Sequence, residues 1–221
     1  MHDIQKYLLK RLASSESARY SDIRPPKVEG NQFAYHLKEV MNAGLVEKKN
    51  TKYILTKKGE MLADRMSMET FKKRIQPKIV TSIVCKKYQN KNEEILFCRR
   101  LKQPFFNYPA LPYGKIHLGE KVSDAARREL LEKTGIDVPD LSFCGNVYIL
   151  IYKKGKLFSH ILHHVFECQI TGSAANKTLP QNCFWSKNRP NESCLPRTQE
   201  IIALVKQKKS PFFKELRADI S

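Results

Sequence analysis

The segment from Gly114 to Gly135 constrains the fold more than any other part of this 221-residue chain. Ser123 and Asp124 suit the start of a helix, because short polar side chains and negative charge are favoured at a helix N-terminus. Gly135 suits the position just beyond the end of that helix, where a left-handed backbone is common. The segment therefore predicts a loop, one short helix and a second loop.

Two carboxylates on this helix share one face. Glu129 and Glu132 are three residues apart, so their side chains are neighbours, and Lys133 lies at i+4 from Glu129. Paired carboxylates beside a glycine turn suit a hard dication such as Mg²⁺, which keeps some waters and engages substrate phosphates. A solvated helix face with a Glu129–Lys133 ion pair has the same spacing. The local pattern alone favours that second interpretation.

The full spacing resembles the Nudix box, the signature of nucleoside-diphosphate-linked-moiety (MutT-like) hydrolases. The family pattern is G-x5-E-x7-R-E-U-x-E-E-x-G-U, where U is a bulky aliphatic residue. The chain matches every fixed position from Gly114 to Ile136 except one, because Lys133 stands where a second glutamate belongs. Further likeness lies upstream in Leu111-Pro112-Tyr113-Gly114, and downstream in Cys183-Phe184-Trp185 and Glu192-Ser193-Cys194-Leu195-Pro196. The resemblance covers about residues 77–210 and implies an α/β (α+β) fold, an α/β/α sandwich with a mixed sheet.

The resemblance also implies roles for individual residues. Mg²⁺ or Mn²⁺ would be held by Glu129, Glu132 and the carbonyl oxygen of Gly114. Glu129 would position or deprotonate the attacking water, while Arg128 would pair with Glu120 and brace the loop against the helix. The implied reaction is hydrolysis of a nucleoside diphosphate linked to another moiety. Lys133 changes the local charge by two units relative to glutamate, which predicts fewer or more weakly bound metal ions.

Aromatic residues lie beside the box, and Phe106 and Tyr113 are the candidate substrate contacts among them. Their rings could stack on a base, or they could fill the interface between sheet and helix, which is the more common role of such residues. Three histidines follow on a predicted strand. Alternation places His160 and His164 on one face and His163 on the other, which does not suit a three-ligand metal site.

The N-terminal third predicts helices followed by a hairpin. Ile4, Leu8 and Leu12 recur at helical spacing, and Phe33 and Leu37 begin a second apolar face. The expected elements are a helix ending near Ala13, a helical turn at 21–23 stopped by Pro25, a helix capped by Asn31 and closed by Gly44, a hairpin over 45–56 and a helix from Lys57 to about Arg74.

Residues 1–70 resemble winged helix-turn-helix domains of the ArsR/MarR kind. In such folds the second helix of the motif enters the major groove of double-stranded DNA and the wing contacts phosphates. The resemblance also implies that a homodimer forms. A module that only dimerises or docks a partner is the alternative. The candidate DNA contacts are Gln32, Tyr35, His36 and Lys38 in the helix and Lys48, Lys49 and Lys52 in the wing.

Pro77 marks the expected boundary between a winged helix-turn-helix domain (1–76) and a Nudix domain (77–221). After it, β-branched runs predict strands, and a last helix is expected over Thr198–Lys206. We expect the segment from Lys208 onward to be loosely held. The six cysteines lack any Cys-x-x-Cys pair, so we expect reduced, mostly buried thiols.

Composition narrows the class of protein. Lys and Arg total 40 against 22 Asp and Glu, a net charge of +18 that favours polyanionic partners, although a solvated lysine-rich surface has the same composition. The longest apolar run, Val147–Tyr152, is far shorter than the roughly 20 residues of a membrane span. Met1–Lys10 carries Asp3 and Lys6, so no signal peptide is visible and we expect a cytoplasmic protein without membrane contact.

Two functions follow from these observations. The first is a Mg²⁺-dependent Nudix pyrophosphohydrolase with an accessory DNA-binding domain, which the intact Arg128, Glu129 and Glu132 favour. The alternative is a transcriptional regulator whose degenerate Nudix domain senses a nucleotide-like ligand without hydrolysis, which Lys133 and Tyr113 favour. The hydrolase is the primary prediction.

Overall fold

The computed structural model describes residues 1–89, 92–187, 190, 193–209 and 211–220. The chain divides into two compact units, Met1–Gln76 and Pro77–Ser221. Residues 90–91, and Glu192 of the downstream Nudix likeness, lie outside the described residues. Within the described ranges, no helix combines the length and apolar character that a membrane span requires.

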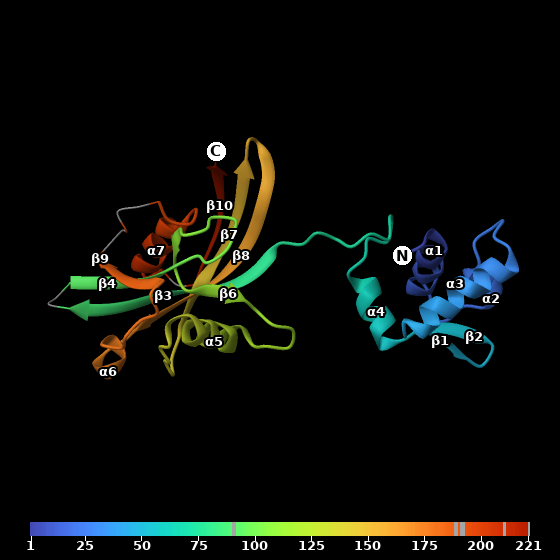
Figure 1. The fold of residues 1–221 in the computed structure, drawn as a ribbon, viewed down its shortest axis with the longest axis horizontal. Helices are drawn as coiled ribbons and strands as arrows, with labels where there is room; N and C mark the ends of the chain where they lie inside the picture. Colours follow the sequence, from blue (N-terminus) through green and yellow to red (C-terminus); the bar gives the residue numbers. More distant parts are fainter. Residues whose placement is uncertain (90–91, 188–189, 191–192, 210, 221) are drawn as a thin grey trace. The chain divides into compact units, whose positions relative to one another are not determined.

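The N-terminal unit has the element order of a winged helix-turn-helix fold (Figure 1). The second helix of the motif is α3, and the antiparallel strands β1 and β2 form the wing. The elements are α1 (Asp3–Ala13), α2 (Tyr20–Ile23), α3 (Gly30–Asn42), β1 (Val46–Lys49), β2 (Lys52–Leu55) and α4 (Lys57–Asp64).

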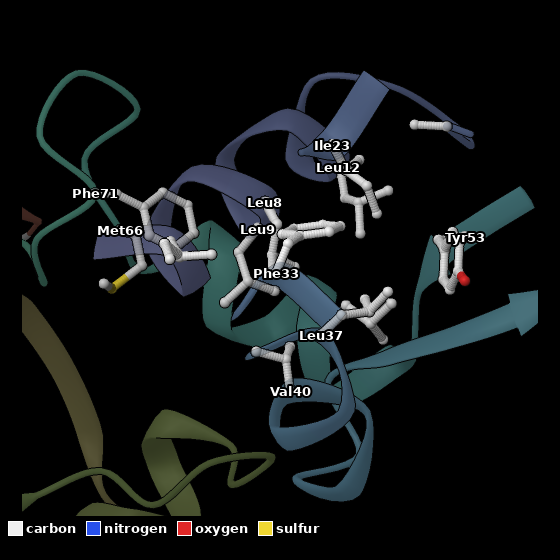
Figure 2. Packing of buried hydrophobic residues seen from close by; sticks show 13 residues of the cluster. Leu8, Leu9, Leu12, Ile23, Phe33, Leu37, Val40, Tyr53, Met66 and Phe71 are labelled. Atoms are coloured by element: carbon white, nitrogen blue, oxygen red, sulfur yellow. The ribbon is translucent and has the colours of Figure 1, made fainter. Parts of the chain in front are cut away.

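Apolar side chains from these helices and the wing meet in one core (Figure 2). Phe33 and Leu37 are buried there, as the helical spacing predicted, and Met41 packs half-buried at its margin. Ala18 and Tyr53 exchange backbone hydrogen bonds of 3.0 and 2.8 Å, which tie the loop before α2 to the wing. The labelled core residues are Leu8, Leu9, Leu12, Ile23, Phe33, Leu37, Val40, Tyr53, Met66 and Phe71.

Two helix boundaries differ from the prediction. Helix α3 begins at Gly30 with Glu29 at the N-cap, so Asn31 is not the capping residue. Helix α4 ends at Asp64 rather than near Arg74. After α4 the chain turns back through Phe71, whose φ is +48°, so that Met66 and Phe71 both reach the core. Burial of these two side chains outweighs the helix propensity of the segment, because propensities are small beside packing.

The C-terminal unit is built on a mixed sheet with the strand order β10-β7-β8-β3-β4-β5, from which β6 pairs β3 and β9 pairs β4. The β3–β8 and β10–β7 pairs are parallel and the other pairs are antiparallel. The strands are β3 (Lys78–Gln89), β4 (Asn92–Arg99), β5 (Pro109–Ala110), β6 (Tyr113–Lys115), β7 (Ser142–Lys153), β8 (Lys156–Gln169), β9 (Cys183–Lys187) and β10 (Phe212–Ile220). The helices are α5 (Val122–Thr134), α6 (Gly172–Ala175) and α7 (Thr198–Lys206).

Helices α5 and α7 cover opposite faces of this sheet (Figure 1). Alternate residues of β3 point to opposite faces, so Ile83 packs with Leu130 of α5 while Val84 packs with Ile201 of α7. This arrangement is the α/β/α sandwich with a mixed sheet that the family resemblance implied.

The C-terminal segment is a strand, so the expectation of a loosely held segment after Lys208 was wrong. Strand β10 runs parallel to β7, with Phe212 opposite Gly145 and Ile220 opposite Lys153. Leu216 and Ala218 point into the α7-side core. A side chain at position 145 would not fit, because an added Cβ would lie 2.2 Å from the carbonyl oxygen of Phe212.

Two cysteines form a disulfide, which corrects the prediction that all six are reduced thiols. Cys98 of β4 and Cys183 of β9 are bonded, because the antiparallel pairing of these strands places them directly opposite each other. Cys85 and Cys168 are buried thiols, as expected. The two cysteines are 85 residues apart, so their spacing along the chain did not indicate the pair.

The three histidines of β8 lie as alternation predicted. His163 is buried with its Nδ1 2.8 Å from the hydroxyl of Ser82, whereas His164 contacts Asn146 at 2.7 Å on the other face. Burial, with a smaller contribution from His164, lowers the pKa of His163 from 6.5 to about 4.

We therefore expect the unfolding free energy to fall as the pH drops from about 6.5 to about 4. In that window the unfolded chain binds a proton at this histidine and the folded chain does not. Urea denaturation of the wild type and of His163→Gln at pH 7 and at pH 4.5 measures the effect. The variant, which lacks the titrating ring, should lose less stability between the two pH values than the wild type. An equal loss in both proteins would contradict the assignment.

Candidate functional site

Helix α5 carries the box residues, and its sequence explains how they are presented. Ala126 and Leu130 are buried against the sheet, which leaves Arg128 and Glu132 on the opposite side of the helix. Gly135 ends the helix with a φ of +71°, as predicted. The helix begins one residue earlier than expected, with Lys121 at the N-cap and no side-chain capping bond.

Glu129 is buried against strand β6. Its side chain rests directly on the backbone of Gly114, since an added Cβ at Gly114 would lie 1.7 Å from the carboxylate carbon. Gly114 itself pairs with Thr81 of β3, which fixes it to the sheet. The glycine of the box is therefore required for the close approach between helix and strand, and its φ is not in the left-handed region.

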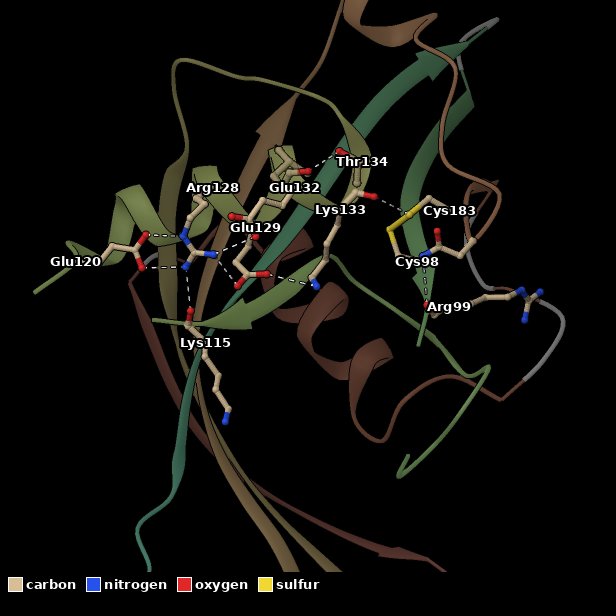
Figure 3. A network of polar contacts seen from close by, with 12 residues as sticks. Cys98, Arg99, Lys115, Glu120, Arg128, Glu129, Glu132, Lys133, Thr134 and Cys183 are labelled. Carbon is tan, nitrogen blue, oxygen red and sulfur yellow. Dashed lines mark hydrogen bonds and ion pairs between the residues drawn. A yellow bond between two sulfur atoms is a disulfide. The ribbon is translucent and has the colours of Figure 1, made fainter. Parts of the chain in front are cut away.

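Arg128 joins the loop to the helix with all five of its N–H groups (Figure 3). Nε and Nη2 donate to the two carboxylate oxygens of Glu120 at 2.7 and 2.9 Å, and Nη2 also donates to the carbonyl oxygen of Lys115 at 3.0 Å. Nη1 donates to Glu129 at 2.9 Å and to Glu132 at 3.3 Å. The structure thus brings Arg128 and Glu120 together, and leaves the guanidinium no donor for a ligand.

These bonds shift the protonation of both partners. The hydrogen bond from Arg128, helped by the backbone N–H of His117, lowers the pKa of the Glu120 carboxyl from 4.5 to about 2. The hydrogen bond to Glu120 raises the pKa of Arg128 above its usual value. Both groups are therefore charged at neutral pH.

Lys133 lies beside the second oxygen of Glu129. Its Nζ is 3.4 Å from Oε2, so the two oxygens of Glu129 face one cation each (Figure 3). The Glu129 side chain is 10% exposed, whereas that of Glu132 is 57% exposed and points to solvent. The structure thus brings Glu129 close to Arg128 and Lys133 and leaves Glu132 on the solvent-exposed side of the helix.

The donor set does not fit a resident Mg²⁺ or Mn²⁺ ion. Arg128 and Lys133 already neutralise the buried carboxylate, and three carboxylates with two cations leave a single net negative charge. Among the described residues, no cluster of three or more His, Cys, Asp or Glu side chains could hold a metal ion. Lys133, which stands where the family pattern has a glutamate, therefore makes the site less suited to a divalent cation.

A cavity of about 750 Å³ lies on the α7 side of the sheet. Phe105, Phe106 and Tyr108, from the loop between β4 and β5, line it together with Phe158 of β8. The rings of Phe105 and Phe158 meet edge to face with centroids 6.3 Å apart. None of the box residues lines this cavity. Of the two predicted substrate contacts, Phe106 is in its wall and Tyr113 is not.

Arg100 connects Tyr113 to the wall of this cavity. The guanidinium carbon of Arg100 is 5.6 Å from the centroid of the Tyr113 ring, and Nε donates to the carbonyl oxygen of Pro104 at 2.9 Å. Pro104 lines the cavity. Sequence reasoning missed the cavity residues Phe158 and Arg197, because only the folded sheet brings them to the loop between β4 and β5.

The predicted DNA contacts form two sets. Gln32, Tyr35 and Lys38 are exposed on α3, and the three wing lysines, Lys48, Lys49 and Lys52, are exposed on β1 and β2. The ring of His36 is half-buried and stacks on His2 with centroids 4.2 Å apart. Its Nδ1 is buried and has no hydrogen-bond partner among the described residues. His36 therefore lies at the edge of the exposed face of α3.

Comparisons with known proteins identify the family of the C-terminal unit. A family model described as the NUDIX domain matches residues 78–192, just over half of the chain. A comparison with curated proteins finds no match. Among solved structures, NrtR of Shewanella oneidensis has a TM-score of 0.51 and 15% identity over 59% of this chain and 62% of that chain. This chain therefore spans less than two thirds of that protein.

Two further structures share the fold. The NUDIX domain of Shewanella oneidensis NrtR complexed with ADP ribose has a TM-score of 0.51 and 15% identity, over 70% of this chain and 99% of that one. A MutT/nudix family protein from Enterococcus faecalis has the same TM-score and identity, over 62% and 63%. At these identities the likeness shows the fold, and the family follows from the model match. The chain belongs to the Nudix family.

Proposed function

We propose that this protein is a DNA-binding regulator whose Nudix domain binds a nucleoside-diphosphate-type ligand without efficient hydrolysis. The proposal departs from the hydrolase expected from the sequence and rests on how the box residues are paired in the fold.

The ion pairing of Glu129 carries this proposal. One carboxylate oxygen accepts a hydrogen bond from Arg128 at 2.9 Å, and the other lies 3.4 Å from Nζ of Lys133. The hydrolase chemistry that the family resemblance implies needs those oxygens for a dication and for the attacking water. A glutamate held between two protein cations favours binding over turnover.

The cavity on the α7 side supports a ligand with an aromatic base. Phe105, Phe106 and Phe158 offer ring faces and edges, and stacking on such rings suits a nucleobase. The similar NUDIX domain of NrtR was solved as a complex with ADP ribose, which supports a ligand of that class for this chain.

The exposed face of α3 and the wing support binding to double-stranded DNA. Exposed side chains on α3 suit base edges in the major groove, and the three wing lysines suit phosphates. A homodimer would present two such helices to half-sites one helical turn apart, about 34 Å.

The ligand test uses ADP-ribose with the full chain in the presence of Mg²⁺. We expect ADP-ribose to raise the melting temperature, because a ligand that binds only the folded state stabilises it, and to be recovered intact by chromatography. Phosphorylated products that disappear in Glu129→Gln would contradict the proposal and establish a hydrolase. The absence of any thermal shift would contradict ligand binding.

The DNA test begins with selection of bound fragments from random duplex DNA. Replacing Lys48, Lys49 and Lys52 with alanine should weaken binding to all sequences alike and reduce the slope of log K against log salt by about 3. The matched control removes three exposed lysines from the Nudix unit, Lys154, Lys156 and Lys214. Binding that does not respond to salt, or that the control weakens equally, would contradict a wing–phosphate role.

The hydrolase remains a second candidate because one observation favours it. The pairing of Arg128 with Glu120 is the contact that the resemblance to hydrolases implies for bracing the loop against the helix. The ADP-ribose experiment separates the two functions, because only the hydrolase converts the ligand to products.

A further inference from the structure

We propose that Lys78, Arg100 and Lys115 form the site that takes the phosphate groups of the ligand, on the α7 side of the sheet. The inference rests on the proposed ligand-binding function and specifies which residues meet the ligand's negative charge. It also implies that binding requires no divalent cation.

Strand register brings the two lysines together. Lys115 of β6 pairs with Val80 of β3, and Lys78 precedes Val80 by two residues, so all three share one face of the sheet. Diagonal neighbours on one face of an antiparallel pair lie roughly 7–8 Å apart, within reach of long side chains. Gly114 faces α5 through its contact with Glu129, so its neighbour Lys115 faces the α7 side. In Figure 3 the Lys115 side chain accordingly points away from the box carboxylates.

Arg100 reaches the same place from the loop between β4 and β5. Its guanidinium lies over the ring of Tyr113, which precedes Lys115 by two residues on β6 and therefore shares its face. Burial lowers the pKa of Lys78, and the charges of Lys115 and Arg100 lower it further. Lys78 is thus close enough to the other two cations to be affected by their charges.

Within the described part of the unit, these three cations have no acidic partner, whereas other cations do. Lys78 donates to the hydroxyl of Ser159 at 3.1 Å and Arg100 to the carbonyl of Pro104, both uncharged, and across the described residues none of the three is ion-paired. By contrast, Lys86 and Arg127 each pair with a carboxylate at 2.6 and 2.7 Å. An anion bound beside these three positive charges would be stabilised by them.

The neighbouring cavity indicates which anion suits the site. Pro104, which accepts the hydrogen bond from Arg100, lines the cavity, and so does Phe158, which precedes the Lys78 partner Ser159. A ligand with its base among the phenylalanine rings would extend its phosphates toward the cations. A nucleoside diphosphate derivative has both a base and phosphate groups, whereas free pyrophosphate has the phosphate groups alone.

Calorimetric titration of the full chain with ADP-ribose and with inorganic pyrophosphate tests the inference, in EDTA and in Mg²⁺. We expect ADP-ribose to bind in EDTA with an affinity that Mg²⁺ does not raise, and pyrophosphate to bind more weakly. Lys78→Met, Arg100→Met and Lys115→Met should each weaken ADP-ribose binding by about tenfold, the loss expected for one hydrogen bond to a charged group. Lys115→Arg should retain binding.

Lys121→Met is the matched control, because it removes one exposed lysine charge at the N-cap of α5. It should bind ADP-ribose like the wild type, and melting temperatures should show that all variants fold. Wild-type binding that the three methionine variants leave unchanged, or that occurs only with Mg²⁺, would overturn this inference while the proposed function stands. No binding of ADP-ribose in either condition would overturn both.

Discussion

Arg128→Gln is expected to lower the unfolding free energy of the Nudix unit by about 3–4 kcal/mol. The substitution removes the guanidinium that bonds Glu120, Glu129 and the carbonyl of Lys115 at once. It leaves the buried Glu129 with Lys133 as its one cationic neighbour among the described residues, and removing one partner of a buried ion pair strands the other charge. Urea denaturation followed by circular dichroism measures the loss.

The neighbouring arginine provides the control. Arg127 also makes a bidentate ion pair, with Asp137 at 2.7 and 3.0 Å, but its side chain is 49% exposed. Exposed pairs contribute little, so Arg127→Gln should cost far less than Arg128→Gln. Equal losses in the two variants would show that the Arg128 contacts do not brace the box.

Gly114→Ala is the second substitution with a large expected effect. The new methyl group would coincide with the Glu129 carboxylate, which must then leave its place against β6. Overpacking of a well-packed site costs about 1–3 kcal/mol, and displacing a buried charged group from its ion pairs adds to that figure. We expect a loss above about 3 kcal/mol, or failure to fold, as measured by urea denaturation and by yield of soluble protein.

Gly119→Ala is the control, because it introduces backbone strain without a steric clash. Gly119 lies in the same motif with a φ of +84°, yet nothing lies within 4 Å of an added Cβ. The strain of a left-handed alanine alone is about 1–2 kcal/mol. If Gly114→Ala cost no more than Gly119→Ala, the close packing of Glu129 on β6 would be wrong.

Features set by neighbouring residues could be predicted from the sequence. The helical spacing of Ile4 and Leu8 placed α1, and Gly135 marked the end of α5, because side-chain periodicity and backbone preference act within a few residues. The pairing of Glu120 with Arg128 followed from the family resemblance, because seven residues of loop and helix lie between them and local periodicity does not predict the contact.

Features set by the sheet could not be predicted in the same way. The Cys98–Cys183 bond depends on the pairing of β4 with β9, and the proximity of Lys78 to Lys115 depends on the pairing of β3 with β6. Both registers join segments that are distant in sequence. Helix α4 was predicted too long because the burial of Met66 and Phe71 outweighed helix propensity.

The addition of β10 to the sheet has a consequence for solubility. The apolar run Val147–Tyr152 of β7 has the composition of an aggregation-prone segment, and an uncovered β7 would offer its backbone groups to strands of other molecules. Strand β10 occupies that position, with Arg217 over the Tyr152 ring at 4.2 Å and Lys214, Glu215 and Asp219 exposed. A second molecule approaching this side therefore meets a charged border, which discourages intermolecular strand pairing.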